Sequence, residues 1–171
     1  LRLLRDEFPG VRMLALGKEE IYESFQPKAK ELGVDDLVIS TGWLDGEELH
    51  AAIASTDVML TPSICFETFG LMNLEAMEFS RPVVATSFGG CPEVISDGVN
   101  GFVANPYKVE EFARRVGQLR VPFCDTVSQS FATQRLGRRA RLEAVELELL
   151  EGDQRFQALV LLGDVAGAAL L

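Results

Sequence analysis

Short apolar runs that alternate with helix-like segments are the feature that most constrains the fold of this chain. Each run is rich in branched residues and is followed by a glycine, a proline or a polar residue. The runs are Val11–Leu16, Leu37–Thr41, Asp57–Thr61, Pro82–Thr86 and Gly101–Ala104. Strands that alternate with helices pair in parallel, because each helix carries the chain back to the start of the next strand. The pattern therefore predicts an α/β fold with a doubly wound parallel sheet.

The segments between the runs predict helices with recognisable ends. Helices are expected over residues 1–8, 19–32, 45–55, 71–79, 92–95 and 109–119. Pro27 should kink or divide the second of these. Asp45, with Glu48 three residues later, has the form of a capping box. If the helix from residue 71 ends at Phe79, Ser80 takes the left-handed conformation that favours glycine.

Loops that contain glycine follow several of the predicted strands. Gly17, Gly42–Trp43 and Gly89–Gly90 come directly or closely after apolar runs, and residues 62–70 follow another. Ligands of doubly wound sheets bind at the carboxyl ends of the strands. These four loops are therefore expected to converge on one edge of the sheet and to form the binding site.

The longest of these loops, residues 62–70, combines an anion site with two carboxylates. Phe69–Gly70 lets the chain turn into a helix, whose first backbone N–H groups and dipole favour a phosphate. Glu67 lies before that helix and Glu75 lies one turn inside it. Carboxylates repel phosphate, so these two side chains are expected to bind neutral hydroxyl groups on either side of it. A nucleotide sugar, with a diphosphate between two sugars, fits this arrangement.

Glu67 and Glu75 also match the E-x7-E motif of the family-four (group 1) retaining glycosyltransferases, which have the two-domain GT-B fold. Further segments resemble family positions in family order. They are Thr61–Ser63, Glu75–Met77, Arg81–Thr86, Gly89–Gly90, Pro92–Ile95 and Asp97–Gly101. The resemblance covers roughly residues 1–119. It implies the Rossmann-like, C-terminal, donor-binding half of a GT-B fold.

The resemblance implies a role for each residue of the motif. Glu75 would accept hydrogen bonds from the ribose hydroxyls, and Glu67, in the catalytic position, would bind hydroxyls of the transferred sugar. Gly70, Leu71 and Met72 would offer backbone N–H groups to the diphosphate and stabilise its growing charge. The alternatives are an exposed helix glutamate at Glu75 and an ordinary loop carboxylate at Glu67.

Other positions would complete the donor site. Phe69 would lie beside the donor, in the loop of residues 62–70, which we call the motif loop. Trp43 and Leu44 would lie near the base, although core packing explains the Trp43 ring equally well. Gly89 and Gly90 would allow the backbone to approach the donor, with a plain tight turn as the alternative.

This resemblance implies transfer of a hexose from a UDP- or GDP-sugar to an acceptor, with retention of configuration. The donor is a substrate, and neither a cofactor nor a metal ion is expected. The family clamps the diphosphate with an Arg and a Lys that follow the first strand of this domain, whereas the sequence starts after that strand; Lys18 is the only local substitute. The N-terminal acceptor domain is also missing, so this chain alone is expected to transfer no sugar.

Two alternatives remain open: a non-catalytic fragment that binds nucleotide sugars, and a sugar-nucleotide epimerase of the same architecture. A dinucleotide-dependent dehydrogenase is disfavoured, because no G-x-G-x-x-G opens a helix.

Composition and the remaining segments set the other expectations. The net charge of −10 argues against nucleic acid or an anionic membrane as a partner. Three cysteines without paired spacing favour a reduced, cytoplasmic protein. The nucleotide-sugar-binding domain is assigned to residues 1–120, and residues 121–171 are a divergent tail. Within that tail residues 135–151 fit a helix or a strand, and the apolar end is too short to span a bilayer.

Overall fold

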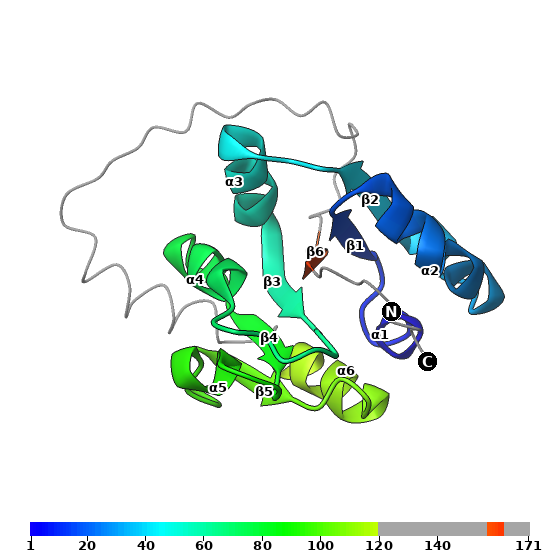
Figure 1. The fold of residues 1–171 in the computed structure, drawn as a ribbon. Helices are drawn as coiled ribbons and strands as arrows, with labels where there is room; N and C mark the ends of the chain where they lie inside the picture. Colours follow the sequence, from blue (N-terminus) through cyan, green and yellow to red (C-terminus); the bar gives the residue numbers. More distant parts are fainter. Residues whose placement is uncertain (120–156, 163–171) are drawn as a thin grey trace.

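A computed structural model describes residues 1–119 and 157–162, which form a parallel sheet with helices on both faces (Figure 1). The strands lie in the order β2-β1-β6-β3-β4-β5, and all neighbouring pairs are parallel. They are β1 Val11–Leu16, β2 Val38–Gly42, β3 Thr56–Thr61, β4 Val83–Thr86, β5 Gly101–Ala104 and β6 Gln157–Leu162. The predicted doubly wound sheet is confirmed, and its first five strands coincide with the apolar runs to within a residue.

The helices occupy the segments between the strands. They are α1 Arg2–Arg5, α2 Glu19–Glu31, α3 Gly46–Ser55, α4 Leu71–Glu78, α5 Cys91–Val94 and α6 Val109–Gln118, with a 3-10 turn at Asp35–Leu37. Helix α2 continues through Pro27 instead of dividing there. The predicted capping box is wrong, because the Asp45 side chain makes no capping hydrogen bond. Gly46, the next residue, has a φ of +52°, so this first turn lacks the helical geometry that a capping box requires.

Alternating side chains of the strands build a core on each face of the sheet. On one face, Leu14, Met59 and Val83 pack with buried residues of α3, α4 and α5. On the other face, Met13 and Val84 pack with buried residues of α1 and α6, and with Phe25 of α2 at the periphery. Successive residues of a strand point to opposite faces, so each short apolar run contributes to both cores.

Strand β6 is the part of the sheet that the sequence pattern did not indicate. It lies between β1 and β3, with Leu14 and Met59 both paired to Val160. A strand from the predicted tail thus lies at the centre of the sheet, between β1 and β3. Cys124, one of the three cysteines, and residues 135–151 lie outside the described residues.

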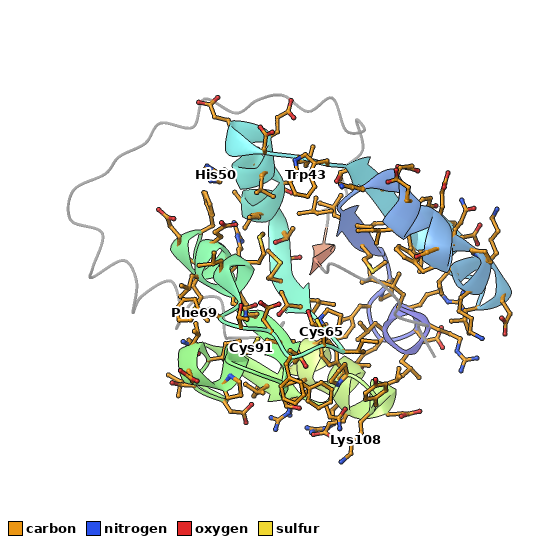
Figure 2. All side chains as sticks on the ribbon, in the orientation of Figure 1. Trp43, His50, Cys65, Phe69, Cys91 and Lys108 are labelled. Atoms are coloured by element: carbon orange, nitrogen blue, oxygen red, sulfur yellow. The ribbon has the colours of Figure 1, made fainter. Side chains whose placement is uncertain are left out.

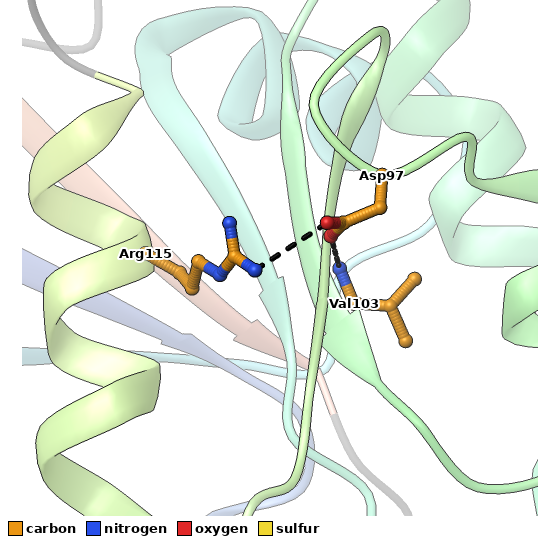
Figure 3. Close-up of polar contacts among 3 residues, drawn as sticks. All are labelled: Asp97, Val103 and Arg115. Atoms are coloured by element: carbon orange, nitrogen blue, oxygen red, sulfur yellow. Dashed lines mark hydrogen bonds and ion pairs between the residues drawn. The ribbon is translucent and has the colours of Figure 1, made fainter.

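Polar contacts add to the apolar packing between the sheet edge at β5 and α6. Asp97 Oδ1 accepts a hydrogen bond of 2.9 Å from the Val103 N–H, and Asp97 Oδ2 lies 3.4 Å from Arg115 Nη2 of α6 (Figure 3). The Arg115 guanidinium also lies over the Phe102 ring, 4.5 Å from its centroid. These contacts fix the loop after α5 against the outer helix.

Among the described residues, no helix combines the length and apolar character needed to cross a bilayer.

Candidate functional site at the carboxyl edge of the sheet

The loops that follow β1, β2, β3 and β4 leave the same edge of the sheet, because all these strands are parallel. The convergence expected from Gly17, Gly42–Trp43, the motif loop and Gly89–Gly90 therefore follows from the topology. Trp43 lies beyond the end of β2, whereas Phe69 lies just before α4 and Cys91 is the first residue of α5 (Figure 2). The candidate site extends along this edge between them.

The motif loop is held against the loop after β4 by backbone contacts. Glu67 forms an isolated parallel bridge with Gly89, and the Gly90 N–H donates to the Glu67 carbonyl oxygen at 2.7 Å. A Cβ at Gly89 would collide with the Glu67 carbonyl, and one at Gly90 with the carbonyl of Thr68. Gly89 also has a φ of +75°. Gly89 and Gly90 are therefore required because their backbone lies close to the backbone of the motif loop. The sequence alone suggested only a close approach to the donor or a tight turn.

A buried polar network holds the start of α4. Gly70 is the N-cap residue, with a φ of +75°. Asn73, in the first turn, is fully buried; its Oδ1 accepts a hydrogen bond of 2.8 Å from Thr61 Oγ1, and its Nδ2 lies 3.4 Å from Cys91 Sγ. The network thus joins the end of β3, the start of α4 and the start of α5. The sequence reasoning missed Asn73, although an amide among the apolar residues of a helix is a signal for a buried hydrogen-bonded group.

The two motif carboxylates are both partly buried. Glu75 Oε2 is buried and has no hydrogen-bond partner among residues 1–119 and 157–162. The charge of Glu67 acts on Cys91: burial raises the pKa of the Cys91 thiol, the Asn73 hydrogen bond lowers it, and Glu67 raises it further. Glu67 and the starts of α4 and α5 therefore belong to one electrostatic environment.

The remaining predicted donor-binding side chains divide into exposed and packed groups. Trp43 is 69% exposed, which contradicts core packing for its ring. Phe69 and Leu71 are also exposed. Leu44 and Met72 instead pack against the core formed with α3 and α4. For Met72 the resemblance implies a role for the backbone N–H, whereas the side chain packs against the core.

The sequence contains no lysine or arginine between Lys30 and Arg81. Lys18, the expected substitute for the family's cations, is the exposed N-cap residue of α2, directly after β1 and its Gly17. Within residues 1–119 and 157–162, no cluster of His, Cys, Asp and Glu could hold a metal ion. The chemistry that this part of the chain offers is thus hydrogen bonding by carboxylates and backbone N–H groups.

Comparisons with known proteins agree with this geometry. A sequence model of the glycosyl transferases group 1 matches residues 1–120. The sulfoquinovosyl transferase SQD2 of Arabidopsis thaliana is 36% identical over 122 residues, covering 70% of this chain and 23% of that protein. The GDP-mannose-dependent alpha-(1-6)-phosphatidylinositol monomannoside mannosyltransferase of Mycolicibacterium smegmatis is 34% identical over 122 residues, covering 68% of this chain and 32% of that protein.

A solved structure shows the same similarity in three dimensions. HepE of Anabaena, in complex with UDP-glucose, superimposes with a TM-score of 0.64 and 26% sequence identity, covering 75% of this chain and 37% of that chain. The chain thus spans less than two fifths of the length of each of these proteins.

Proposed function

Because this chain belongs to the glycosyl transferases group 1 family and has the Rossmann-like fold of the C-terminal half of a GT-B enzyme, we propose that it binds the nucleotide-sugar donor. The transferred group is a hexose, the nucleotide is UDP or GDP, and transfer retains the configuration. HepE, solved with UDP-glucose, and the GDP-mannose-dependent relative support this class of donor. An acceptor-binding domain is the partner that this half requires, because group transfer needs both substrates held together.

The unpartnered oxygen of Glu75 is the observation that carries the proposal. A buried carboxylate oxygen without a donor is costly, since it has left water and gained no hydrogen bond. Glu75 lies in α4, and the first N–H groups of this helix suit a phosphate. The buried oxygen of Glu75 would gain hydrogen bonds from two hydroxyl groups of a sugar that is attached to that phosphate. The ribose of a nucleoside diphosphate provides that arrangement.

Glu67 and the loop after β4 are assigned to the other side of the diphosphate. The Glu67 carboxylate accepts hydrogen bonds from the transferred hexose, and the Gly89 bridge fixes its backbone. The N–H groups of Gly70, Leu71 and Met72 bind the diphosphate, whose charge increases as it leaves. Exposed Trp43 at the end of β2 lies beside the base.

The substitution Glu75→Ala tests this assignment by two effects of opposite sign. Nucleotide binding should weaken by about 1.5–3 kcal/mol, because hydrogen bonds to a charged group are lost. The stability of the free protein should stay the same or rise, because a buried oxygen without a partner is removed. Calorimetric titration of UDP and GDP gives the first quantity, and urea unfolding gives the second.

Three comparisons make this experiment decisive. Glu75→Gln should lose less affinity, since its amide oxygen still accepts, and Glu47→Ala, an exposed glutamate of α3, should lose none. A 2′-deoxynucleotide should bind the wild type more weakly, whereas Glu75→Ala should hardly distinguish the two nucleotides. Equal discrimination by both proteins would move the ribose away from Glu75 and would contradict the proposal.

A further inference from the structure

Three aromatic side chains gather beside the motif loop and have no role in the site described so far. Phe66 precedes Glu67, Phe88 lies in the loop after β4, and Tyr107 lies in the loop after β5. The ring centroids of Phe66 and Phe88 are 6.3 Å apart, and those of Phe88 and Tyr107 are 6.0 Å apart. We call these three rings the aromatic row.

The backbone at or next to each ring takes part in a bridge or a local hydrogen bond. Phe66 adjoins the bridge between Glu67 and Gly89. The Phe88 N–H donates to Thr86 Oγ1 at 3.2 Å, and the Tyr107 N–H donates to Asn105 Oδ1 at 2.9 Å. These contacts restrict the loop backbones, and such restriction lowers the entropy cost of binding.

The row remains open to solvent although its loops are held. Phe66 is 84% exposed and Tyr107 is 58% exposed, while Phe88 between them is half-buried. A protein partner requires about 800 Å² of contact on each side. Three partly covered rings, each offering at most about 150–250 Å² when fully buried, fall short of that area. A ligand of the size of one or two rings fits the row better.

The position of the row indicates which ring-sized ligand it binds. Along the carboxyl edge the loops follow the strand order, so Trp43 after β2 and Tyr107 after β5 lie at opposite ends, with the motif loop between them. The proposed function places the base beside Trp43 and the transferred hexose at Glu67. The row thus lies beyond the hexose, on the side away from the nucleotide.

The faces of aromatic rings carry negative potential, and the C–H face of a pyranose is apolar and weakly positive, so the two surfaces are complementary. We propose that Phe66, Phe88 and Tyr107 form a stacking site for a pyranose ring of the acceptor, an inference that rests on the proposed function. Glu67, next to Phe66 in the chain, then lies between the donor hexose and the acceptor sugar.

The experiment uses the whole chain, with methyl α-D-glucopyranoside and methyl α-D-mannopyranoside as probes and sorbitol as an acyclic control. Saturation-transfer difference NMR should show transfer to the ring C–H protons of the glycosides and none to sorbitol. Phe66→Leu and Tyr107→Leu keep an apolar side chain but remove its flat face. Each should weaken the signal roughly threefold to tenfold, if a sugar stacks about as strongly as a second aromatic ring. Tyr22→Leu, in the aromatic pair of α2, should leave the signal unchanged.

Different results would contradict the assignment of the aromatic row as a sugar site and the proposed function. Nucleotide titration of the same variants should give unchanged affinities for UDP and GDP. If nucleotide binds but the glycoside signal is absent, or survives both leucine substitutions, the row is not a sugar site. Competition of UDP-glucose with the glycoside would place the donor hexose on the row and overturn the acceptor assignment. If neither UDP nor GDP binds the wild type, the proposed function itself is contradicted.

Discussion

At the scale of single residues, Asn73 links three elements of the candidate site. Its side chain contacts Thr61 at the end of β3 and Cys91 at the start of α5, and all three residues are buried. Its Nδ2 also lies where a Cβ at Gly70 would project, so the amide fills the space beside the N-cap glycine. Because the N–H groups at this helix start are assigned to the diphosphate, Asn73 positions them without touching the ligand.

We therefore expect Asn73→Ala to destabilise the protein by about 1–3 kcal/mol, since it leaves the buried Thr61 hydroxyl without its acceptor. Urea unfolding measures the change. Leu74→Ala is the matched control, because Leu74 is the next residue of α4 and is partly exposed; it should cost less. Equal losses in the two variants would show that the network adds nothing beyond the packing of the helix.

The cysteines provide a second residue-scale prediction. Cys65 is exposed and Cys91 is buried, and burial raises the pKa of the Cys91 thiol. The thiolate is the reactive form, so iodoacetamide should modify Cys65 quickly and Cys91 only when the protein opens. Peptide mapping by mass spectrometry separates the two sites. Similar rates at both sites in the folded protein would contradict the buried position of Cys91.

The same pKa shift predicts how stability depends on pH. A thiol with a raised pKa in the folded state favours folding below its ordinary pKa, and this contribution is lost as the pH rises through the raised value. The free energy of unfolding should therefore fall at alkaline pH, and it should fall less in Cys91→Ala.

At the scale of elements, the C-terminus of α4 contains a strained residue. The helix ends at Glu78, and Ser80 has a φ of +58°, the only positive φ of a non-glycine residue in the described ranges. This agrees with the left-handed conformation predicted for Ser80. A residue with a Cβ costs about 1 kcal/mol or more in this conformation, because the Cβ crowds the following carbonyl oxygen.

Ser80→Gly should consequently raise the stability by about 0.5–1 kcal/mol, the strain relief being offset in part by the greater entropy of glycine in the unfolded chain. Thermal unfolding measures the change. Ser55→Gly, at the end of α3, is the control, and it should destabilise because this serine is helical. A lower melting temperature for Ser80→Gly would mean that Ser80 does not hold this conformation in solution.

At the scale of the whole molecule, β6 joins two parts of the sheet. Strands β2 and β1 lie on one side of it, and β3, β4 and β5 lie on the other. Its backbone pairs with β1 from Val11 to Leu16 and with β3 from Thr56 to Leu60. Without such a strand, β1 and β3 would each present a row of unpaired backbone groups.

Val160→Pro tests this position, because proline lacks the N–H needed in a central strand. We expect a loss of at least about 1–3 kcal/mol for the missing backbone hydrogen bond, together with faster amide exchange in β1 and β3. Gln157→Pro is the control at the first residue of the strand, where proline is better tolerated. Wild-type stability in Val160→Pro would show that β6 does not lie in the sheet in solution.

Local sequence patterns were sufficient to predict most of the helices and strands. Strands β1 to β5, the turn at Gly70 and the left-handed Ser80 all follow from local patterns, because alternation, helix periodicity and glycine preference act within a few residues. The convergence of the loops also follows, since parallel strands end at one edge. The Asp45 cap was the local prediction that failed, because the conformation of Gly46 overrides the motif.

The contacts between distant segments could not be predicted from local patterns. The central place of β6, the contact of Gly89 and Gly90 with the motif loop, the network around Asn73 and the aromatic row each join residues far apart in the chain. No local pattern encodes such pairings. They form because buried backbone groups and side chains must find partners across the whole molecule, and which partners meet is settled when both faces of the sheet are covered together.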